Sequence, residues 1–518
     1  MLHLPDRKQV QQVAEDLGMH LTEEEIGPYC ESVRSQLVGF SAFFDRLTSP
    51  DVDHEFALGG DCERRGWAPT RDEDSDNVWL YKTQIHPTGS GVLDGTSVAL
   101  KDHIPVRGVP LSYGSHVMDD FTADFDATIV TRMLAAGATI TGKLNMDDFS
   151  CGGLGWGGIG DFGRIPNPNS PQHITGGSSS GSAVAVAKGE VDISIGGDQG
   201  GSVRIPASWC GVVGLKPTHG LVPHTGIVGS DRMLDSVGPL TRSVADAARC
   251  LFAIAGPDGH DPRWDDEENV LPDYQRYLSS MASGVQGLRI GVLEEGFAPP
   301  IEPEVRASVE QALKQLAEAG AILVPVSVPV HSQTLIPYQI LSVMGSTLLR
   351  QTHFIMSGSK DFYPIRLMKA LDKAAQVDAD RMPPLLKSRY LTGEFAFRSF
   401  RGGLYGKAQN ARKWFTSQYD QVMETIDVLA LPTTVMRAPE YSVSPSQEEA
   451  VARTLGLLRL GGYNPVANTA PFNYTGHPAL TLPCGKVDDL PVGLQFVAPK
   501  HREDLLFRAG RGYEELGD

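Results

Sequence analysis

Serine and glycine residues that could form a nucleophilic site gather in residues 174–206, which read ITGGSSSGSAVAVAKGEVDISIGGDQGGSVRIP. In this stretch Ser202 follows Gly200 and Gly201, where the backbone can approach a ligand because no Cβ stands in the way. Consecutive N–H groups of such a turn can point into one small space, as an oxyanion hole requires. A tight turn between two strands would show the same residues, so the pattern needs support from elsewhere in the chain.

A second Gly-Ser turn lies upstream at residues 176–182, and a lysine lies at the end of an apolar segment. A serine hydroxyl both donates and accepts, so it can relay a proton. Lys101 follows the apolar residues 98–100, where it either reaches water or is partly desolvated. Desolvation lowers a lysine pKa, by about 3–5 units when burial is complete, and a neutral amine can act as a base. A neutral Lys101 also requires Asp102 to point away from it, as strand alternation would place it.

Four other motifs carry weaker expectations. Residues 155–160 match G-x-G-x-x-G, but the flanking strand, helix and acidic residue of a dinucleotide site are missing. Ser179 occupies the centre of a G-x-S-x-G motif, yet the preceding residues are rich in Pro and Asn rather than strand-forming. We interpret the S-x-x-K match of Ser357 and Lys360 as chance, and a lone histidine such as His477 as structural.

The composition excludes several classes of partner. The chain has 518 residues, of which 41% are hydrophobic, and a formal net charge of -18 with no run of basic residues. Nucleic acid and anionic membrane surfaces are therefore poor partners. The six cysteines form no CxxC pair and no zinc-type cluster, so we expect reduced thiols, no metal site and no cofactor. Because no signal peptide or apolar span is visible, a cytoplasmic protein without membrane contact is expected.

The elements that must position these residues follow from the apolar patterns. Residues 7–18 and 22–40 indicate helices, with Asp6 as a cap and Thr22 and Glu25 as a capping box. After an acidic, turn-rich linker, strand and helix patterns alternate, which favours an α/β architecture. Strands are expected in 96–104, 138–146, 191–197, 288–297, 321–330, 427–434, 478–485 and 491–499, and helices in 126–137, 244–256, 303–320 and 502–517. Residues 335–405 show no regular pattern.

Residues 176–218, GGSSSGSAVAVAKGEVDISIGGDQGGSVRIPASWCGVVGLKPT, resemble the glycine- and serine-rich signature of the amidase-signature family. Other segments that resemble the family are VALKDHIPVRGVPLSYGS (98–115), GKLNMDDF (142–149), SVGPLTRSVADAA (236–248), NTAPFNYTGHPALTLPCG (468–485) and LPVGLQFVAP (490–499). The resemblance extends over most of the chain and implies an α/β fold with a large mixed sheet flanked by helices. The N-terminal helices and residues 256–263 resemble a bacterial subgroup of broad-specificity and enantioselective amidases.

The resemblance implies a Ser-Ser-Lys triad without a histidine. Ser202 would be the nucleophile, Ser178 the relay serine after a cis peptide bond from Gly177, and Lys101 the base. The oxyanion hole would consist of the N–H groups of Gln199, Gly200, Gly201 and Ser202. For substrate binding we expect a loop of Ser150, Cys151, Gly152 and Gly153, with parts of residues 335–405.

Three positions depart from the usual family pattern. Gly197 stands where threonine is common, Ser180 where glycine is usual, and His103 where asparagine commonly follows Lys-Asp. None of them removes a member of the triad. We interpret the charged neighbours of the nucleophile, Asp198 and Arg204, as scaffolding of the loop.

These observations predict an amidase that hydrolyses a small carboxylic amide to an acid and ammonia or an amine. Residues 1–76 would form a helical extension and linker that mediates a homodimer, and residues 77–518 the catalytic domain, with 335–405 covering the substrate. Two alternatives remain: a transamidating component that works on aminoacyl-tRNA, and an esterase of α/β-hydrolase type that uses Ser179. The sequence does not name the amide.

Overall fold

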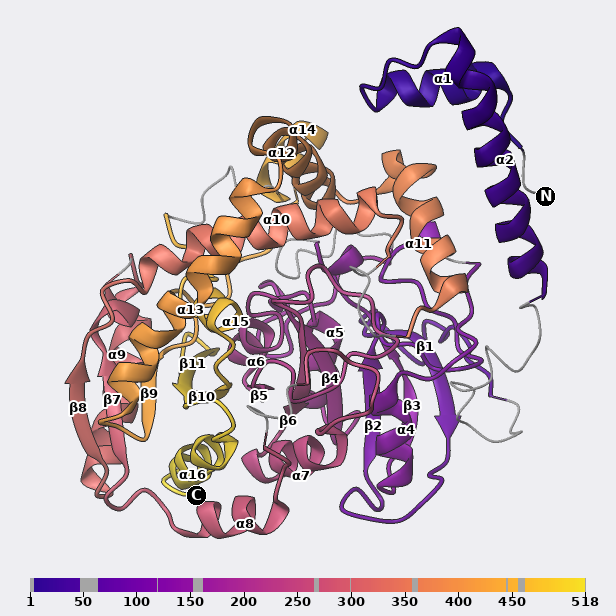
Figure 1. The fold of residues 1–518 in the computed structure, drawn as a ribbon. Helices are drawn as coiled ribbons and strands as arrows, with labels where there is room; N and C mark the ends of the chain where they lie inside the picture. Colours follow the sequence, from indigo (N-terminus) through magenta and orange to yellow (C-terminus); the bar gives the residue numbers. More distant parts are fainter. Residues whose placement is uncertain are drawn as a thin grey trace. The chain divides into compact units, whose positions relative to one another are not determined.

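The computed structural model describes residues 4–46, 64–118, 120–151, 162–264, 270–298, 300–355, 362–443, 446–454 and 462–517. The chain divides into two compact units, Met1–Gly60 and Asp61–Asp518 (Figure 1). The motif at 155–160, the pair Ser357 and Lys360, and the candidate residues Gly152 and Gly153 lie outside the described residues.

The first unit is a pair of helices, α1 (Arg7–Asp16) and α2 (Glu23–Arg46). Asp6 caps α1 through a reciprocal capping box with Gln9. Thr22 and Glu25 form the second box, with N–H to side-chain oxygen distances of 2.8 and 3.3 Å. Both expected helices and both expected caps are therefore confirmed.

The described part of the second unit contains an 11-stranded mixed sheet in the order β1-β3-β2-β4-β6-β5-β10-β11-β9-β7-β8. The strands are β1 (Trp79–Ile85), β2 (Ser97–Lys101), β3 (Thr139–Leu144), β4 (Ile193–Asp198), β5 (Val213–Lys216), β6 (Ser236–Thr241), β7 (Arg289–Leu293), β8 (Ile322–Val326), β9 (Val428–Pro432), β10 (Ala479–Val487) and β11 (Leu490–Val497). Strand β2 is parallel to both β3 and β4, so the ends of β2 and β4 lie at one edge of the sheet. This arrangement brings Lys101 and Asp198, the last residues of the two strands, to the same edge.

Helices flank the sheet (Figure 1). They are α4 (Thr128–Ala135), α5 (Ser180–Ala187), α6 (Arg204–Cys210), α7 (Val244–Ile254), α8 (Tyr274–Ala282), α9 (Pro303–Glu318), α10 (Leu335–Gln351), α11 (Ile365–Gln376), α12 (Pro384–Phe400), α13 (Gly403–Met423), α14 (Gln447–Thr454), α15 (Ala470–Thr475) and α16 (Glu503–Glu514). The expected α/β class with a large mixed sheet is confirmed. No helix in these described ranges is long and apolar enough to cross a membrane.

The structure corrects the expectation for residues 335–405, which form helices α10, α11 and α12 in their described part. The buried residues of α10 include Ser342, Gly345, Ser346 and Thr347. Because small and polar residues occupy much of the buried face, the apolar periodicity that usually marks a helix is weak.

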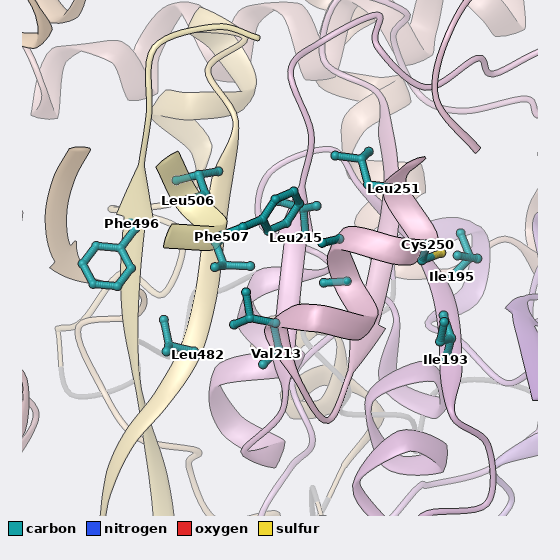
Figure 2. Packing of buried hydrophobic residues seen from close by; sticks show 14 of the residues in the cluster. Ile193, Ile195, Val213, Leu215, Cys250, Leu251, Leu482, Phe496, Leu506 and Phe507 are labelled. Carbon is teal, nitrogen blue, oxygen red and sulfur yellow. The ribbon is translucent and has the colours of Figure 1, made fainter. Parts of the chain in front are cut away.

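The main apolar core fixes the strands that carry the site. Ile193 and Ile195 of β4 belong to one buried cluster with residues of β5, β10 and β11 and of the helices α7 and α16. Figure 2 shows Cys250 of α7 beside Ile195, and Phe507 of α16 beside Leu215 of β5. Burial of each large apolar side chain contributes about 1.5–3 kcal/mol, so β4 is held firmly behind the turn that follows it.

Candidate active site

The turn after β4 carries Ser202 and is held by the carboxylate of Asp198. Asp198 is the last residue of β4, and α6 begins six residues later at Arg204. The Asp198 carboxylate accepts hydrogen bonds from the N–H of Gly201 at 2.8 Å and of Val203 at 3.2 Å. Gly201 has a φ of 129°, a conformation that residues with a Cβ rarely adopt, so glycine is required there. Ser202 itself is half-buried.

A buried ion pair anchors this turn to distant strands and helices. Both guanidinium contacts of Arg204 to the Asp198 carboxylate measure 3.0 Å. Arg204 also donates to Gln495 of β11 at 2.8 Å and to Asn473 of α15 at 2.7 Å. Burial alone would raise the pKa of Asp198, but Arg204 and Asn473 outweigh burial and hold that pKa far below its usual range. The interpretation of Asp198 and Arg204 as loop scaffolding is confirmed.

Lys101, the last residue of β2, meets Ser178 in the interior of the protein. Its Nζ lies 2.6 Å from the Ser178 Oγ, and both side chains are buried. Burial lowers the pKa of Lys101 to about 7, although the negative charges of Asp147 and Asp198 oppose that shift. The peptide bond between Gly177 and Ser178 is cis, as the resemblance implied.

The carboxylate of Asp102, the residue after β2, is engaged by partners other than Lys101. It forms a buried ion pair with Lys143 at 3.0 Å and accepts from the Ser112 N–H and hydroxyl at 2.8 and 2.6 Å. The expectation that Asp102 points away is therefore confirmed. These partners hold the charge of Asp102 where it does not stabilise a charged Lys101.

The two Gly-Ser turns lie against each other through Ser179. The Ser179 N–H donates to the carbonyl of Ser202 at 3.3 Å, and its hydroxyl donates to the carbonyl of Gly197 at 3.2 Å. Ser179 is fully buried, and the residues before it form a loop instead of a strand. This is not the exposed strand-to-helix elbow that an α/β-hydrolase nucleophile requires.

The N–H groups of the Ser202 turn are not equivalent. That of Gly201 is engaged by Asp198. Those of Gln199, Gly200 and Ser202 make no hydrogen bond to any residue that the structure describes. Three of the four donors in the expected oxyanion hole are thus not engaged by any described part of the chain, and the fourth stabilises the turn.

A pocket of about 570 Å³, the part open to solvent included, lies beside this turn. Its walls are mostly apolar and aromatic. The lining residues are His103, Tyr113, Phe149, Ser150, Gln199, Val228, Gly229, Ser230, Ser346, Leu349, Phe354, Leu371, Met382, Leu386 and Tyr390. Residues of α10, α11 and α12 therefore form one side of it. Of the candidate substrate residues, Ser150 lines the pocket, whereas the Cys151 sulfur accepts from Arg389 at 3.2 Å.

Several residues that line this pocket have unusual backbone conformations. Tyr113, Phe149 and Ser150 have φ values of 55°, 47° and 59°, a region that non-glycine residues seldom occupy. The rings of Tyr113 and Phe149 stack at a centroid distance of 5.8 Å. Each such residue costs on the order of 1–3 kcal/mol, and strain of this kind clusters at functional sites.

Two residues that sequence reasoning missed contact the Ser202 turn from the other side. A Cβ on Gly200 would lie 2.0 Å from the hydroxyl oxygen of Tyr338 on α10, so that hydroxyl packs directly on the turn. The Thr469 hydroxyl donates to the carbonyl of Gly200 at 2.7 Å. Thr469 lies in a segment that resembles the family, which could have singled it out, whereas nothing in the sequence marks Tyr338.

The remaining candidates have structural roles. His477 is buried between Thr475 and Asp420, at 2.8 and 2.9 Å, as expected of a structural histidine. The cysteines in the described ranges, Cys30, Cys151, Cys210, Cys250 and Cys484, are free thiols.

Comparison with known proteins gives the class of the molecule. A family model described as Amidase matches residues 81–507. The chain is 33% identical over 485 residues to an enantioselective amidase of Rhodococcus rhodochrous, covering 93% of this chain and 89% of that protein. It is 35% identical over 441 residues to a glutamyl-tRNA(Gln) amidotransferase subunit from Halobacterium salinarum, covering 85% and 99%.

A solved structure with the same fold is that of the peptide amidase PAM in complex with the competitive inhibitor chymostatin. The TM-score is 0.64 at 29% identity, over 82% of this chain and 84% of that one. The chain therefore belongs to the amidase family, the amidase-signature enzymes. As a member of this family it is a carbon–nitrogen hydrolase.

Proposed function

We propose that this enzyme hydrolyses a small carboxylic amide to the acid and ammonia or an amine, through an acyl-enzyme on Ser202. The observation that carries the proposal is the buried contact of Lys101 and Ser178, at 2.6 Å, with the pKa of Lys101 lowered to about 7. A lysine with such a pKa is largely neutral at slightly alkaline pH and can accept a proton.

The acylation step uses the two serines and the lysine in sequence. Lys101 accepts the proton of the Ser178 hydroxyl, and Ser178 accepts the proton of Ser202 as its oxygen attacks the amide carbon. The carbonyl π electrons move onto the carbonyl oxygen. The unoccupied N–H groups of Gln199, Gly200 and Ser202 then stabilise the negative charge on that oxygen.

Collapse of this intermediate breaks the carbon–nitrogen bond. Ser178 gives a proton to the leaving nitrogen and recovers one from Lys101, which leaves the acyl group on Ser202. Water then attacks the ester carbon while the same relay accepts its proton, and the acid leaves as Ser202 is reprotonated. The acyl group would lie in the pocket beside Gln199 and Ser150.

The experiment compares two neighbouring serine hydroxyls in the purified full-length chain. Ammonia release from benzamide and aliphatic amides should be abolished in Ser202→Ala and remain measurable in Ser179→Ala. Ser179 is the matched control because it belongs to the same pair of turns. Labelling of Ser179 by a covalent serine probe, or turnover by Ser202→Ala, would contradict the assignment.

A second candidate is a transamidating component of a larger enzyme. The similarity to the Halobacterium salinarum amidotransferase protein favours it, because the match covers 99% of that protein. The enantioselective amidase match favours a stand-alone hydrolase, since it extends over 93% of this chain. Turnover of simple amides by the isolated chain supports hydrolysis. Activity on glutamine that appears only with partner proteins and an aminoacyl-tRNA supports the second candidate.

A further inference from the structure

His103 is a buried histidine with no hydrogen-bond partner in the part of the chain that the structure describes. Its exposed fraction is 2%, and neither Nδ1 nor Nε2 has a partner among the residues that the structure describes. Buried polar groups in proteins are nearly always hydrogen-bonded, so an unpaired one calls for an explanation. His103 lines the pocket beside the nucleophile turn, which supplies the space for a partner.

A second unpartnered group lies next to it. The Oε1 atom of Gln199 is buried with no partner in the described ranges, and Gln199 lines the same pocket. The two side chains meet over Gly197: a Cβ there would lie 2.7 Å from the His103 Nε2 and 3.3 Å from the Gln199 Nε2. The missing side chain at position 197 therefore leaves room for both groups at one corner of the pocket.

The hydrogen-bonding capacity of this corner follows from the charge state of His103. Burial, together with nearby Lys101 and His224, lowers the pKa of His103 well below its usual range. The neutral ring offers one donor and one acceptor. With the Gln199 Oε1 as another acceptor, the corner is matched best by a group that both donates and accepts.

The rest of the pocket is suited to a flat apolar group. Its walls include the stacked rings of Tyr113 and Phe149, and further apolar surface from Leu349, Phe354 and Leu386. Aromatic rings favour stacked or edge-on contact with another ring. A planar acyl group could therefore occupy the pocket with one edge at the polar corner.

We propose that His103 and Gln199 form a polar subsite that binds a hydroxyl or N–H substituent on an aromatic acyl group. The substrate class is then aromatic carboxamides with such a substituent on the ring. This inference rests on the proposed function, because it assumes that the acyl group lies in the pocket. His103 acts here as a specificity-determining residue and takes no part in the proton relay.

The test uses pairs of substrates that differ in hydrogen bonding and hardly in size: 3- and 4-hydroxybenzamide against 3- and 4-methylbenzamide. Sites built to hydrogen-bond a substrate hydroxyl discriminate strongly against analogues without it. We expect the wild type to prefer at least one hydroxyl compound over its methyl partner by about tenfold or more in kcat/KM, mainly through KM. Equal rates, or a preference for the methyl compounds, would overturn the proposal.

Variants at position 103 locate the preference. His103→Phe keeps an aromatic ring but removes both nitrogens, so the hydroxyl preference should disappear or reverse. Exposed His86 provides the matched control, and His86→Phe should retain the preference. A preference that survives in His103→Phe would overturn the role of His103.

Binding to Ser202→Ala separates this inference from the proposed function. Calorimetric titration of that variant with the same four amides measures recognition without turnover. If the wild type hydrolyses none of them but the hydroxyl compound binds tighter, the reaction assignment fails and the subsite stands. If all are hydrolysed and bound without preference, the subsite fails and the reaction assignment stands.

Discussion

At the residue scale, the proposed chemistry depends on how the pKa of a buried lysine is lowered. Lys101 has the Ser178 hydroxyl at 2.6 Å, while the adjacent Asp102 is turned toward Lys143. Asp147 and Asp198 are the carboxylates that most strongly favour the charged form of Lys101, and burial outweighs them. The balance places the pKa of Lys101 at about 7, within the range where a base can work.

The first prediction concerns the pH profile. Because the proposed base is the neutral form of Lys101, kcat/KM should rise with pH along a limb centred near pH 7. Lys101→Arg keeps the charge but cannot accept a proton, so it should lose about a hundredfold or more in kcat. Steady-state rates between pH 5.5 and 9 check both statements. A Lys101→Arg enzyme with most of the wild-type kcat would show that the lysine acts only through its charge.

The second prediction couples Gly197 and His103, two of the three positions that depart from the usual family residues. Because a Cβ at 197 would lie 2.7 Å from the His103 Nε2, Gly197→Thr should destabilise the fold while His103 is present. In the double variant Gly197→Thr, His103→Asn the clash is relieved. Free energies of unfolding for the four proteins of this cycle should show a coupling of about 0.5–3 kcal/mol. Additive effects would mean that the two departures are independent.

At the element scale, two contacts hold the Ser202 turn in place. Helix α10 packs on it, and the ion pair of Asp198 and Arg204 connects it to the sheet. Tyr338 of α10 packs on Gly200, so α10 restrains the position of the Ser202 turn. The same helix also forms part of one wall of the pocket. Arg204, at the start of α6, joins β4 to β11 and α15. The position of Ser202 therefore depends on elements far from it in sequence.

The third prediction tests this ion pair. Arg204→Met leaves the Asp198 carboxylate buried without its counter-charge and should lower the free energy of unfolding by about 3–5 kcal/mol. The surface pair of Arg398 and Glu394, at 3.3 Å, provides the control, since Arg398→Met should cost about 1 kcal/mol or less. Urea unfolding of both variants measures the difference. Equal losses would show that the buried pair does not hold the turn.

Strands with a clear alternation or a continuous apolar run were predictable from the sequence, and others were not. Residues 191–197 alternate clearly, and β4 lies at Ile193–Asp198. Strands β5 and β6 were not identified as strands, because Gly214, Gly238 and Pro239 interrupt their short apolar patterns. Their pairing with each other, with β10 and with β4 makes them part of the sheet.

The candidate site was likewise predictable only where its residues carry a local sequence pattern. Lys101, Ser178 and Ser202 carry local sequence patterns and a family resemblance, so they could be named, and their catalytic roles stay predictions. Tyr338 and the polar corner at His103 depend on contacts between distant segments. No spacing along the chain encodes such contacts.

At the scale of the whole molecule, the helix pair α1 and α2 of the first unit bears on how copies of the chain assemble. Four apolar side chains of α2 expose between 51% and 66% of their surface, so α1 does not cover them: Tyr29, Val38, Phe40 and Phe43. Exposed apolar surface of this kind is typical of an interaction site. We propose that α2 pairs with its copy in a homodimer.

The fourth prediction follows from that proposal. Light scattering of the full-length protein should give about twice the 55.9 kDa of one chain. Deletion of residues 1–47 should give a monomer or cause aggregation. A truncated protein with unchanged mass and unchanged melting temperature would contradict the proposed role of α2.

The uncharged lysine has a consequence for folding itself. Lys101 and Lys216 are both buried, and burial lowers the pKa of each from 10.5 to about 7. Around pH 8 the native protein holds these amines largely unprotonated, whereas the unfolded chain protonates them, so unfolding takes up protons.

The free energy of unfolding should therefore rise with pH between 7 and 8.5, by about 1.4 kcal/mol per pH unit for each proton taken up. Above that range the buried thiols of Cys210 and Cys250, whose pKa burial raises to values above those of the unfolded chain, oppose this rise, because the unfolded chain then loses protons that the native thiols keep. Melting temperatures of the wild type and of Lys101→Met across this range measure the coupling, and a slope unchanged in the variant would contradict it. Lys101, which we propose as the base, thus also contributes, together with Lys216, to a native state that binds fewer protons than the unfolded chain at this pH.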